Sequence, residues 1–241
     1  MKVDFHTHTA DDPLDAIPYS TMQLIDRAAA LGYGALAITL HERQLDLAPL
    51  ASYAAERGIV LIPGIEQTIE GKHVLLINFR RGTERVKTFA ELERLKASEP
   101  GLVIAPHAFY PTQTCLRRAL DRYGELFDAV EYNAMFTTSL NFNTPAEAWA
   151  RAHGKPMVGS GDVHRLRQLG TTWTEVDARA DADAICAAVA MGRVRVHASP
   201  LAWRDAAGIM MDLLAWRTPA GLRTETTPAS GSTNTSLPLN A

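Results

Sequence analysis

The chain has 241 residues, of which 46% are hydrophobic, and a formal net charge of -3 from 24 basic and 27 acidic side chains. This near balance excludes a broad basic field that would favour nucleic acid or a membrane surface, and the length allows one α/β barrel or two small domains. No stretch approaches 18 apolar residues, the first residues lack a secretory apolar run, and Cys115 and Cys186 form no disulfide or thiolate-zinc pattern. We therefore expect a cytoplasmic enzyme in which both cysteines are buried.

Short apolar runs typical of strands alternate with segments of helical period along most of the chain. Strands are expected at residues 1–5, 35–39, 59–63, 73–79, 102–105, 129–132 and 156–159. Helices are expected at residues 20–32, 46–57, 88–98, 112–122, 144–153, 181–191 and about 203–216. One exception is hairpin-like, because residues 70–72 turn two extended runs within 65–79 without an intervening helix.

Strands that are apolar on both faces and followed by helices predict a parallel sheet covered by helices, either open or closed into a barrel. No internal break precedes residue 200, so one domain is expected over residues 1–216. Residues 217–241 are dominated by Thr, Ser, Pro, Gly and Asn, and this composition predicts a disordered polar tail.

The first expected strand ends in two histidines, His6 and His8, that are two residues apart. Side chains two apart on a strand point the same way, so the two imidazoles would make half of a metal site, with Asp4 on the same face. Two exposed histidines on an extended N-terminus are an equally good explanation of the pair alone. The rest of the chain has to decide between them.

Histidine and acidic residues recur at the ends of the other expected strands. They are His41, Glu66, His107, Glu131 with Asn133, and Asp162 with His164. The carboxyl ends of parallel barrel strands meet at one mouth, so these side chains are expected to be neighbours, which favours a metal site. His153 and His197 fall outside the pattern, and we expect structural or solvent-exposed roles for them.

The chain here resembles the PHP (polymerase and histidinol phosphatase) metallophosphoesterase family. The motifs that carry the resemblance are Asp4-Phe5-His6-Thr7-His8, Ile38-Thr39-Leu40-His41, Pro63-Gly64-Ile65-Glu66, Ile104-Ala105-Pro106-His107, Val130-Glu131-Tyr132-Asn133 and Gly159-Ser160-Gly161-Asp162-Val163-His164. They span most of residues 1–200 in the order of the family. The resemblance implies a distorted (β/α)7 barrel, similar to a TIM barrel, with two or three divalent metals at the carboxyl ends of its strands.

The same resemblance implies a ligand set for each ion. The first ion would take His6, His8, Glu66 and Asp162; the second Glu66, His73 and His107; the third His41, His164 and a loop carboxylate. Asp11, Asp12 and Asp15 are all within reach for that last position, and Asp15 is slightly favoured over Asp12. Asp4 would then orient a ligand histidine rather than bind metal.

The sequence departs from the family at Leu40, where an aspartate usually precedes the histidine. Glu42 or Asp46 would be the substitutes nearest in sequence for that carboxylate. Losing an outer partner of this kind typically costs about 10–100-fold in metal affinity or activity, so the third ion has less support than the other two.

Imidazole and carboxylate ligands without thiolate favour Mn, Zn or Fe. Two such ions bridged by Glu66 would activate a water molecule for hydrolysis of a phosphate ester on a small phosphorylated substrate. His41 or His164 would protonate the leaving oxygen, and Arg43 and Arg165 are candidates for binding the phosphate.

Three other functions stay open. A PHP-type nuclease or phosphodiesterase would use the same chemistry, but no basic stripe or aromatic platform adjoins the motifs, so nucleic acid is not favoured. A metal-dependent amidohydrolase usually calls for a bridging lysine where Glu66 stands. A metal-binding regulatory module without catalysis is the third, and Leu40 is the feature that supports it.

Overall fold

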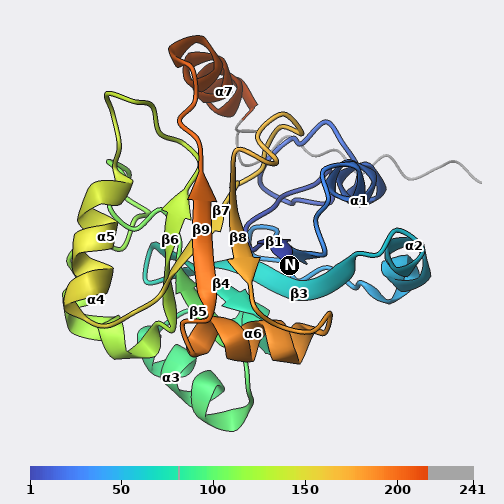
Figure 1. Ribbon diagram of the computed structural model, residues 1–241. Coiled ribbons are helices and arrows are strands. Elements are labelled where there is room, and N and C mark those ends of the chain that lie inside the picture. Colours follow the sequence, from blue (N-terminus) through green and yellow to red (C-terminus); the bar gives the residue numbers. More distant parts are fainter. Residues whose placement is uncertain (81, 217–241) are drawn as a thin grey trace, which may run out of the picture.

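The computed structural model describes residues 1–80 and 82–216, and one sheet of nine strands lies at its centre (Figure 1). In chain order the strands are β1 (Lys2–Asp4), β2 (Ala35–Ile38), β3 (Val60–Ile69), β4 (Lys72–Ile77), β5 (Leu102–Ala105), β6 (Ala129–Asn133), β7 (Met157–Ser160), β8 (Thr172–Val176) and β9 (Val194–Ala198). Across the sheet they follow the order β7-β6-β5-β4-β3-β2-β1-β8-β9. Strands that are consecutive in the chain are therefore mostly neighbours in the sheet.

The sheet is mixed rather than wholly parallel. Strands β1, β2 and β3 pair in parallel, as do β5, β6 and β7, whereas β4 runs antiparallel to both β3 and β5. The expected hairpin is confirmed at the β3–β4 turn, where Glu70 and Gly71 have φ values of 48° and 75°, as the central residues of a type I′ turn require. At the other edge, β8 is antiparallel to β1 and β9 to β8.

The two edges of the sheet meet, so the sheet nearly closes into a barrel (Figure 1). Strand β7 packs against β8 and β9, and Thr174 on β8 donates its hydroxyl to the carbonyl of Gly159 on β7 at 2.8 Å. A Cβ at Gly159 would lie 2.7 Å from the carbonyl oxygen of Trp173, so only glycine allows this approach. The predicted single-domain α/β barrel is confirmed, with nine strands where the resemblance implied seven.

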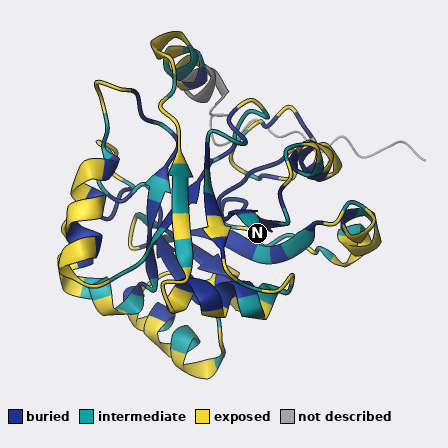
Figure 2. Cartoon of the chain, viewed as in Figure 1, coloured by how far each residue is buried: buried dark blue, intermediate teal, exposed yellow. Residues whose placement is uncertain are grey.

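Helices surround the sheet with exposed outer faces, and the last of them stands beyond the end of β9 (Figure 1 and Figure 2). They are α1 (Thr21–Ala30), α2 (Ala51–Ala55), α3 (Phe89–Ser98), α4 (Ala119–Tyr123), α5 (Asn143–Ala152), α6 (Ala182–Ala190) and α7 (Trp203–Trp216). Helix α1 forms within the range expected at 20–32 and begins after Ser20, which forms a capping box with Gln23. Of the helix expected at 112–122, only the end forms, because Pro111 and the residues after it make a loop that packs on the mouth of the barrel.

The barrel interior and the space beneath the helices are filled by aliphatic and aromatic side chains that are almost fully buried. Val3 and Phe5 of the first strand pack inside the barrel with Ile62 and Leu75. Among the described residues, we find no helix that combines the length and the apolar character needed to span a membrane. The tail predicted at 217–241 lies outside the described residues.

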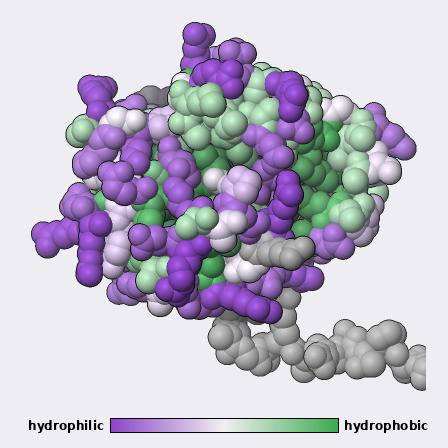
Figure 3. Space-filling model, turned by 90° about the horizontal axis from the view of Figure 1, so that it is seen from below, coloured by the Kyte–Doolittle hydropathy of each residue, from purple (hydrophilic) through white to green (hydrophobic). Residues whose placement is uncertain are grey.

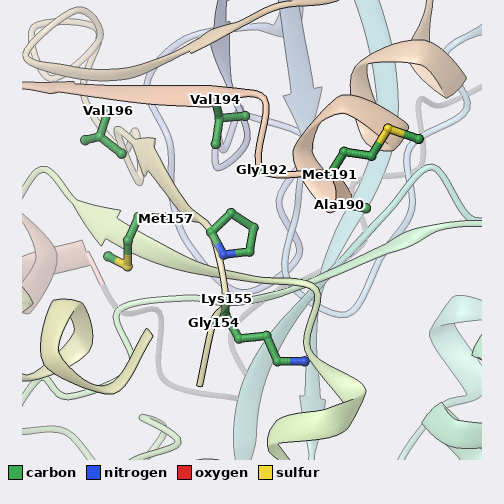
Figure 4. A pocket seen from close by; sticks show the side chains of 9 residues that line it. Gly154, Lys155, Met157, Ala190, Met191, Gly192, Val194 and Val196 are labelled. Atoms are coloured by element: carbon green, nitrogen blue, oxygen red, sulfur yellow. The ribbon is translucent and has the colours of Figure 1, made fainter. Parts of the chain in front are cut away.

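A pocket of about 410 Å³ opens at the amino ends of β7 and β9. Its lining comes from residues 154–157, 190–192, 194 and 196 (Figure 4). The surface seen from below in Figure 3 mixes charged and apolar residues. Because Asp162 and His164 follow β7, they lie at its opposite end, and the pocket is separate from the site described next.

Candidate metal centre

The structure gathers the predicted ligands at the carboxyl ends of the parallel strands. His6 and His8 follow β1, His41 follows β2, His107 follows β5, and Asp162 with His164 follows β7. Between His6 and His8, Thr7 points the other way, where its hydroxyl donates to the carbonyl of Ala37 at 2.6 Å. This alternation turns both imidazoles into the mouth of the barrel, as the spacing predicts.

Glu66 lies at the centre of the cluster and is 1% exposed. Its Oε2 is 3.1 Å from Nε2 of His6, 3.1 Å from Nε2 of His41 and 3.3 Å from Nε2 of His8. Its Oε1 is 2.6 Å from Nδ1 of His73 and 3.0 Å from Nε2 of His107. His73 reaches this end because β4 runs antiparallel to β3 and begins at the mouth. Each oxygen of Glu66 therefore faces its own group of imidazoles.

Asp162 faces a third direction of the same cluster. Its Oδ1 is 3.5 Å from Nε2 of His6, 3.6 Å from Nε2 of His8 and 3.4 Å from Nδ1 of His164. Asp162 and His107 have backbone φ values of 45° and 30°, which residues other than glycine rarely adopt. Backbone strain of this kind clusters at functional sites, where the surrounding structure holds it in place.

Two loop carboxylates reach the cluster, and they take different positions. Asp12 is fully buried, with Oδ2 2.9 Å from Nδ1 of His8, 3.0 Å from Nδ1 of His41 and accepting from the His41 backbone N–H at 2.9 Å. Asp15 has Oδ2 3.0 Å from Nε2 of His164 and 3.9 Å from Nδ1 of His41. Asp12 therefore contacts the outer ring nitrogens of two candidate ligands, and Asp15 contacts a third histidine directly.

The contacts of Asp12 also bear on the missing aspartate at position 40. Leu40 is buried in an apolar cluster, and Glu42 turns away to accept from the backbone N–H of Thr68. Asp46 accepts from the backbone of Ala48. In the described part of the chain, the carboxylate beside His41 is thus supplied by Asp12, and not by either of the substitutes nearest in sequence.

Asp4 and Glu131 hold the histidines from outside the cluster. Asp4 Oδ1 accepts from the backbone N–H groups of His6 and Gly161 at 3.1 and 3.0 Å. A side chain at Gly161 would bring a Cβ within 2.9 Å of Asp4, so glycine is needed there. Glu131 Oε1 lies 2.8 Å from Nδ1 of His6, and its Oε2 accepts from the His107 backbone at 2.6 Å. These contacts are those of residues that orient ligands.

The donor set fits divalent transition metals. Three groups of ligand atoms lie within 4.8 Å of one another: His6 with Glu66 and His107, His6 with His8 and Asp162, and His8 with His41 and Glu66. Nε2 of His8 is fully buried and has no hydrogen-bond partner, although its Nδ1 contacts Asp12. This nitrogen lies 3.3 Å from Oε2 of Glu66 and 3.6 Å from Oδ1 of Asp162, and a buried ring nitrogen between two carboxylates is placed as a metal ligand requires.

Charge coupling in the cluster is strong. Burial opposes the charged form of His6, but Asp162, Glu66 and Glu131 outweigh it and raise the pKa of His6 to about 10. Burial likewise opposes the charge on His41, and Glu66 nevertheless raises its pKa to about 9. Without metal, these imidazoles are therefore cations that compensate the carboxylates.

The other predicted residues lie near the site or away from it. Arg43 is exposed and donates to the carbonyl of Asp11 at 3.4 Å, and Arg165, adjacent to His164, is half-buried. Away from the cluster, His153 stacks on Trp149, and His197 stacks on Trp173. These contacts agree with the structural or solvent-exposed roles expected for His153 and His197.

Cys115 contacts the site, although no sequence pattern indicated this contact. Both cysteines are buried as expected, but Cys115 Sγ lies 3.4 Å from Nδ1 of His107, whereas Cys186 packs in the apolar interior. Residues 107 and 115 belong to the loop that replaces the start of the expected helix at 112–122. A helix prediction there placed the thiol on the wrong element and hid this contact.

The fold and the site define an α/β barrel with a histidine–carboxylate cluster at the carboxyl ends of its strands. A family model described as PHP-associated matches residues 141–194, which include Asp162 and His164. This match covers less than a quarter of the chain. No curated protein matches it.

Solved structures with the same fold have low sequence identity to the chain. PsfC from Pseudomonas syringae is 16% identical, with a TM-score of 0.57 over 89% of this chain and 96% of that one. A proposed metal-dependent phosphoesterase from Bifidobacterium adolescentis is 17% identical, with a TM-score of 0.50 over 68% of this chain and 87% of that one. A lesion-specific endonuclease from Pyrococcus furiosus is 14% identical, with a TM-score of 0.52 over 87% of this chain and 66% of that one.

Proposed function

We propose that the chain is a metal-dependent phosphoesterase that hydrolyses a small phosphomonoester with two or three bound Mn, Zn or Fe ions. The observation that carries this proposal is Glu66, a buried carboxylate with imidazoles on both oxygens, beside the unpartnered Nε2 of His8. In this proposal residues 1–216 form the catalytic domain.

The proposed ligand sets are those that the resemblance implies. The first ion would take His6, His8, Glu66 and Asp162, and the second Glu66, His73 and His107. The third would take His41, His164 and Asp15. Asp12 would act from outside the ions, because its Oδ2 already meets Nδ1 of both His8 and His41.

Ions bound in this way would supply Lewis acidity at the phosphate oxygens and lower the pKa of a bound water. Glu66 would hold the two sides of the centre in a fixed relation, because its two oxygens face different histidines. His41 or His164 would pass a proton to the leaving oxygen where the third ion does not occupy that imidazole. Arg165 and Arg43 would bind the phosphate near the rim, since the guanidinium fork matches phosphate oxygens.

The test is hydrolysis of a panel of phosphomonoesters by the purified protein with Mn, Zn or Fe, before and after chelation. Turnover that is lost on chelation and restored by metal is expected. Glu66→Gln should remove turnover with little change in fold, because it keeps the shape and loses the charge. Glu125→Gln is the matched control, since that side chain is 97% exposed. Full activity in metal-free protein, or in Glu66→Gln, would contradict the proposal.

The same panel of substrates also tests the competing functions. A short oligonucleotide tests the nuclease alternative, for which the similarity in fold to an endonuclease is the specific reason. Cleavage of the oligonucleotide without phosphomonoester turnover would replace our proposal by a phosphodiesterase. Bound metal without turnover of either substrate would favour a regulatory module.

A further inference from the structure

Most histidines of the cluster have an oxygen beside the ring nitrogen that faces away from Glu66. Nδ1 of His6 lies beside Glu131, and Nδ1 of both His8 and His41 beside Asp12. Nδ1 of His164 lies 3.0 Å from the carbonyl oxygen of Asp162. An oxygen at this position fixes which ring nitrogen carries the proton and leaves the other nitrogen available for a metal.

His107 differs from these four histidines, because the atom beside its Nδ1 is a sulfur. Cys115 Sγ lies 3.4 Å from that nitrogen, while Nε2 of the same ring lies 3.0 Å from Oε1 of Glu66. Thr112 Oγ1 is 2.9 Å from the same sulfur, so a second contact fixes the thiol from its other side. Cys115 is 1% exposed, so bulk solvent has almost no access to this contact.

The loop that carries Cys115 is held against the site at several points. The carbonyl of Thr114 accepts from the backbone N–H of His73 at 2.9 Å, and the Arg117 N–H donates to the carbonyl of Ala108 at 2.9 Å. The loop therefore ties together His73 and His107, the two imidazoles that face Oε1 of Glu66. A thiol placed by such a loop has a defined position relative to the ring.

We propose that Cys115 is a positioning residue whose sulfur accepts a hydrogen bond from Nδ1–H of His107 and so leaves Nε2 of that ring free to face the metal beside Glu66. This inference rests on the metal centre proposed above. Because sulfur is a weak acceptor, it gives the ring less basicity than a carboxylate does. The ion held by Glu66, His73 and His107 is then the one that leaves first when a chelator is added.

The experiment is a metal titration against a competing chelator under reducing conditions, with Co²⁺ as a spectroscopic probe. Cys115→Ala should weaken the binding of one ion about 10–100-fold and leave the others unchanged. Cys115→Ser should restore most of the metal affinity, since a hydroxyl oxygen also accepts a hydrogen bond from Nδ1–H. Cys186→Ala is the matched control, because that buried thiol packs among apolar side chains. Thermal unfolding of each variant shows whether it is folded.

A second measurement needs no variant. Ring-nitrogen NMR of the zinc-loaded wild-type protein should show His107 with its proton on Nδ1 and zinc on Nε2. Zinc on Nδ1 would overturn the role of Cys115 while the metal centre stands. The same holds if Cys115→Ala binds metal as tightly as the wild type, or if Cys115→Ser binds it as weakly as Cys115→Ala. Wild-type protein that binds no metal would overturn the centre and this inference together.

Discussion

One loop carboxylate, Asp12, touches two candidate metal ligands at once. Its Oδ2 meets Nδ1 of His8 and of His41, and its Oδ1 accepts from the backbone N–H groups of Leu14 and Asp15. The same side chain therefore shapes the loop and orients two rings. This replaces the carboxylate that Leu40 does not provide.

Replacing Asp12 by alanine should weaken metal binding about 10–100-fold, because both rings lose the partner that fixes their orientation and proton. Competition with a chelator measures the affinity. Asp11→Ala is the control, since the Asp11 side chain is exposed and its carboxylate accepts from the hydroxyls of Thr9 and Thr21. Equal affinity in Asp12→Ala and wild type would show that Asp12 positions nothing.

Single residues differ in how far the sequence predicts their place. The spacing of His6 and His8 predicts a shared direction on an extended chain, and the structure brings both rings beside Asp162, which in turn lies beside His164. The contact between Asp12 and His41 joins two loops, and no local periodicity encodes it. Sequence reasoning could find this contact only by asking which carboxylate replaces the one missing at Leu40.

At the scale of elements, the barrel closes at a seam where β7 packs against β8 and β9. The sequence predicts most of the elements that lead to this seam, but not the two strands on its far side. Helices α1 and α5 and the β3–β4 hairpin follow from caps, apolar periodicity and turn residues. The apolar pattern does not predict β8 or β9, because they are short and alternate with polar and charged residues such as Thr174 and Arg195. Such strands form where a neighbouring edge is available, which depends on the tertiary structure.

Gly159→Ala should destabilise the fold, because its Cβ would press against the backbone carbonyl of Trp173. Overpacking of this kind costs about 1–3 kcal/mol, which a denaturant titration resolves. In Gly34→Ala the nearest atom, Cβ of Met1, would lie 3.3 Å from the new Cβ, so this control should cost less. If both variants were equally stable, the close approach at the seam would carry no weight.

On the scale of the whole molecule, the barrel converts ligands that are far apart in sequence into neighbours. His6 and Asp162 are far apart in sequence, and Nε2 of the one lies 3.5 Å from Oδ1 of the other. The rule that the carboxyl ends of barrel strands meet predicts this gathering. It does not predict that the two oxygens of Glu66 face two different groups of histidines, because this depends on side-chain angles and on the antiparallel direction of β4.

Metal binding should release protons, and its affinity should rise with pH. In metal-free protein the pKa of His6 is about 10 and that of His41 about 9, both above the ordinary value of about 6.5. The stability that these protonated rings give the metal-free fold is complete below about pH 6.5 and is lost as the pH rises through those values. The difference in Tm between loaded and metal-free protein should therefore widen between about pH 6 and about pH 9. A narrowing gap would contradict this charge balance.

The most direct test of the metal centre is elemental analysis of protein purified without chelator, alongside Glu66→Gln prepared in the same way. The wild type should hold about two or three equivalents of Mn, Zn or Fe per chain, and the variant clearly fewer, because Glu66 is the carboxylate that both groups of histidines share. Wild-type protein that takes up no metal even when these ions are supplied, or a variant that holds as much as the wild type, would contradict the account.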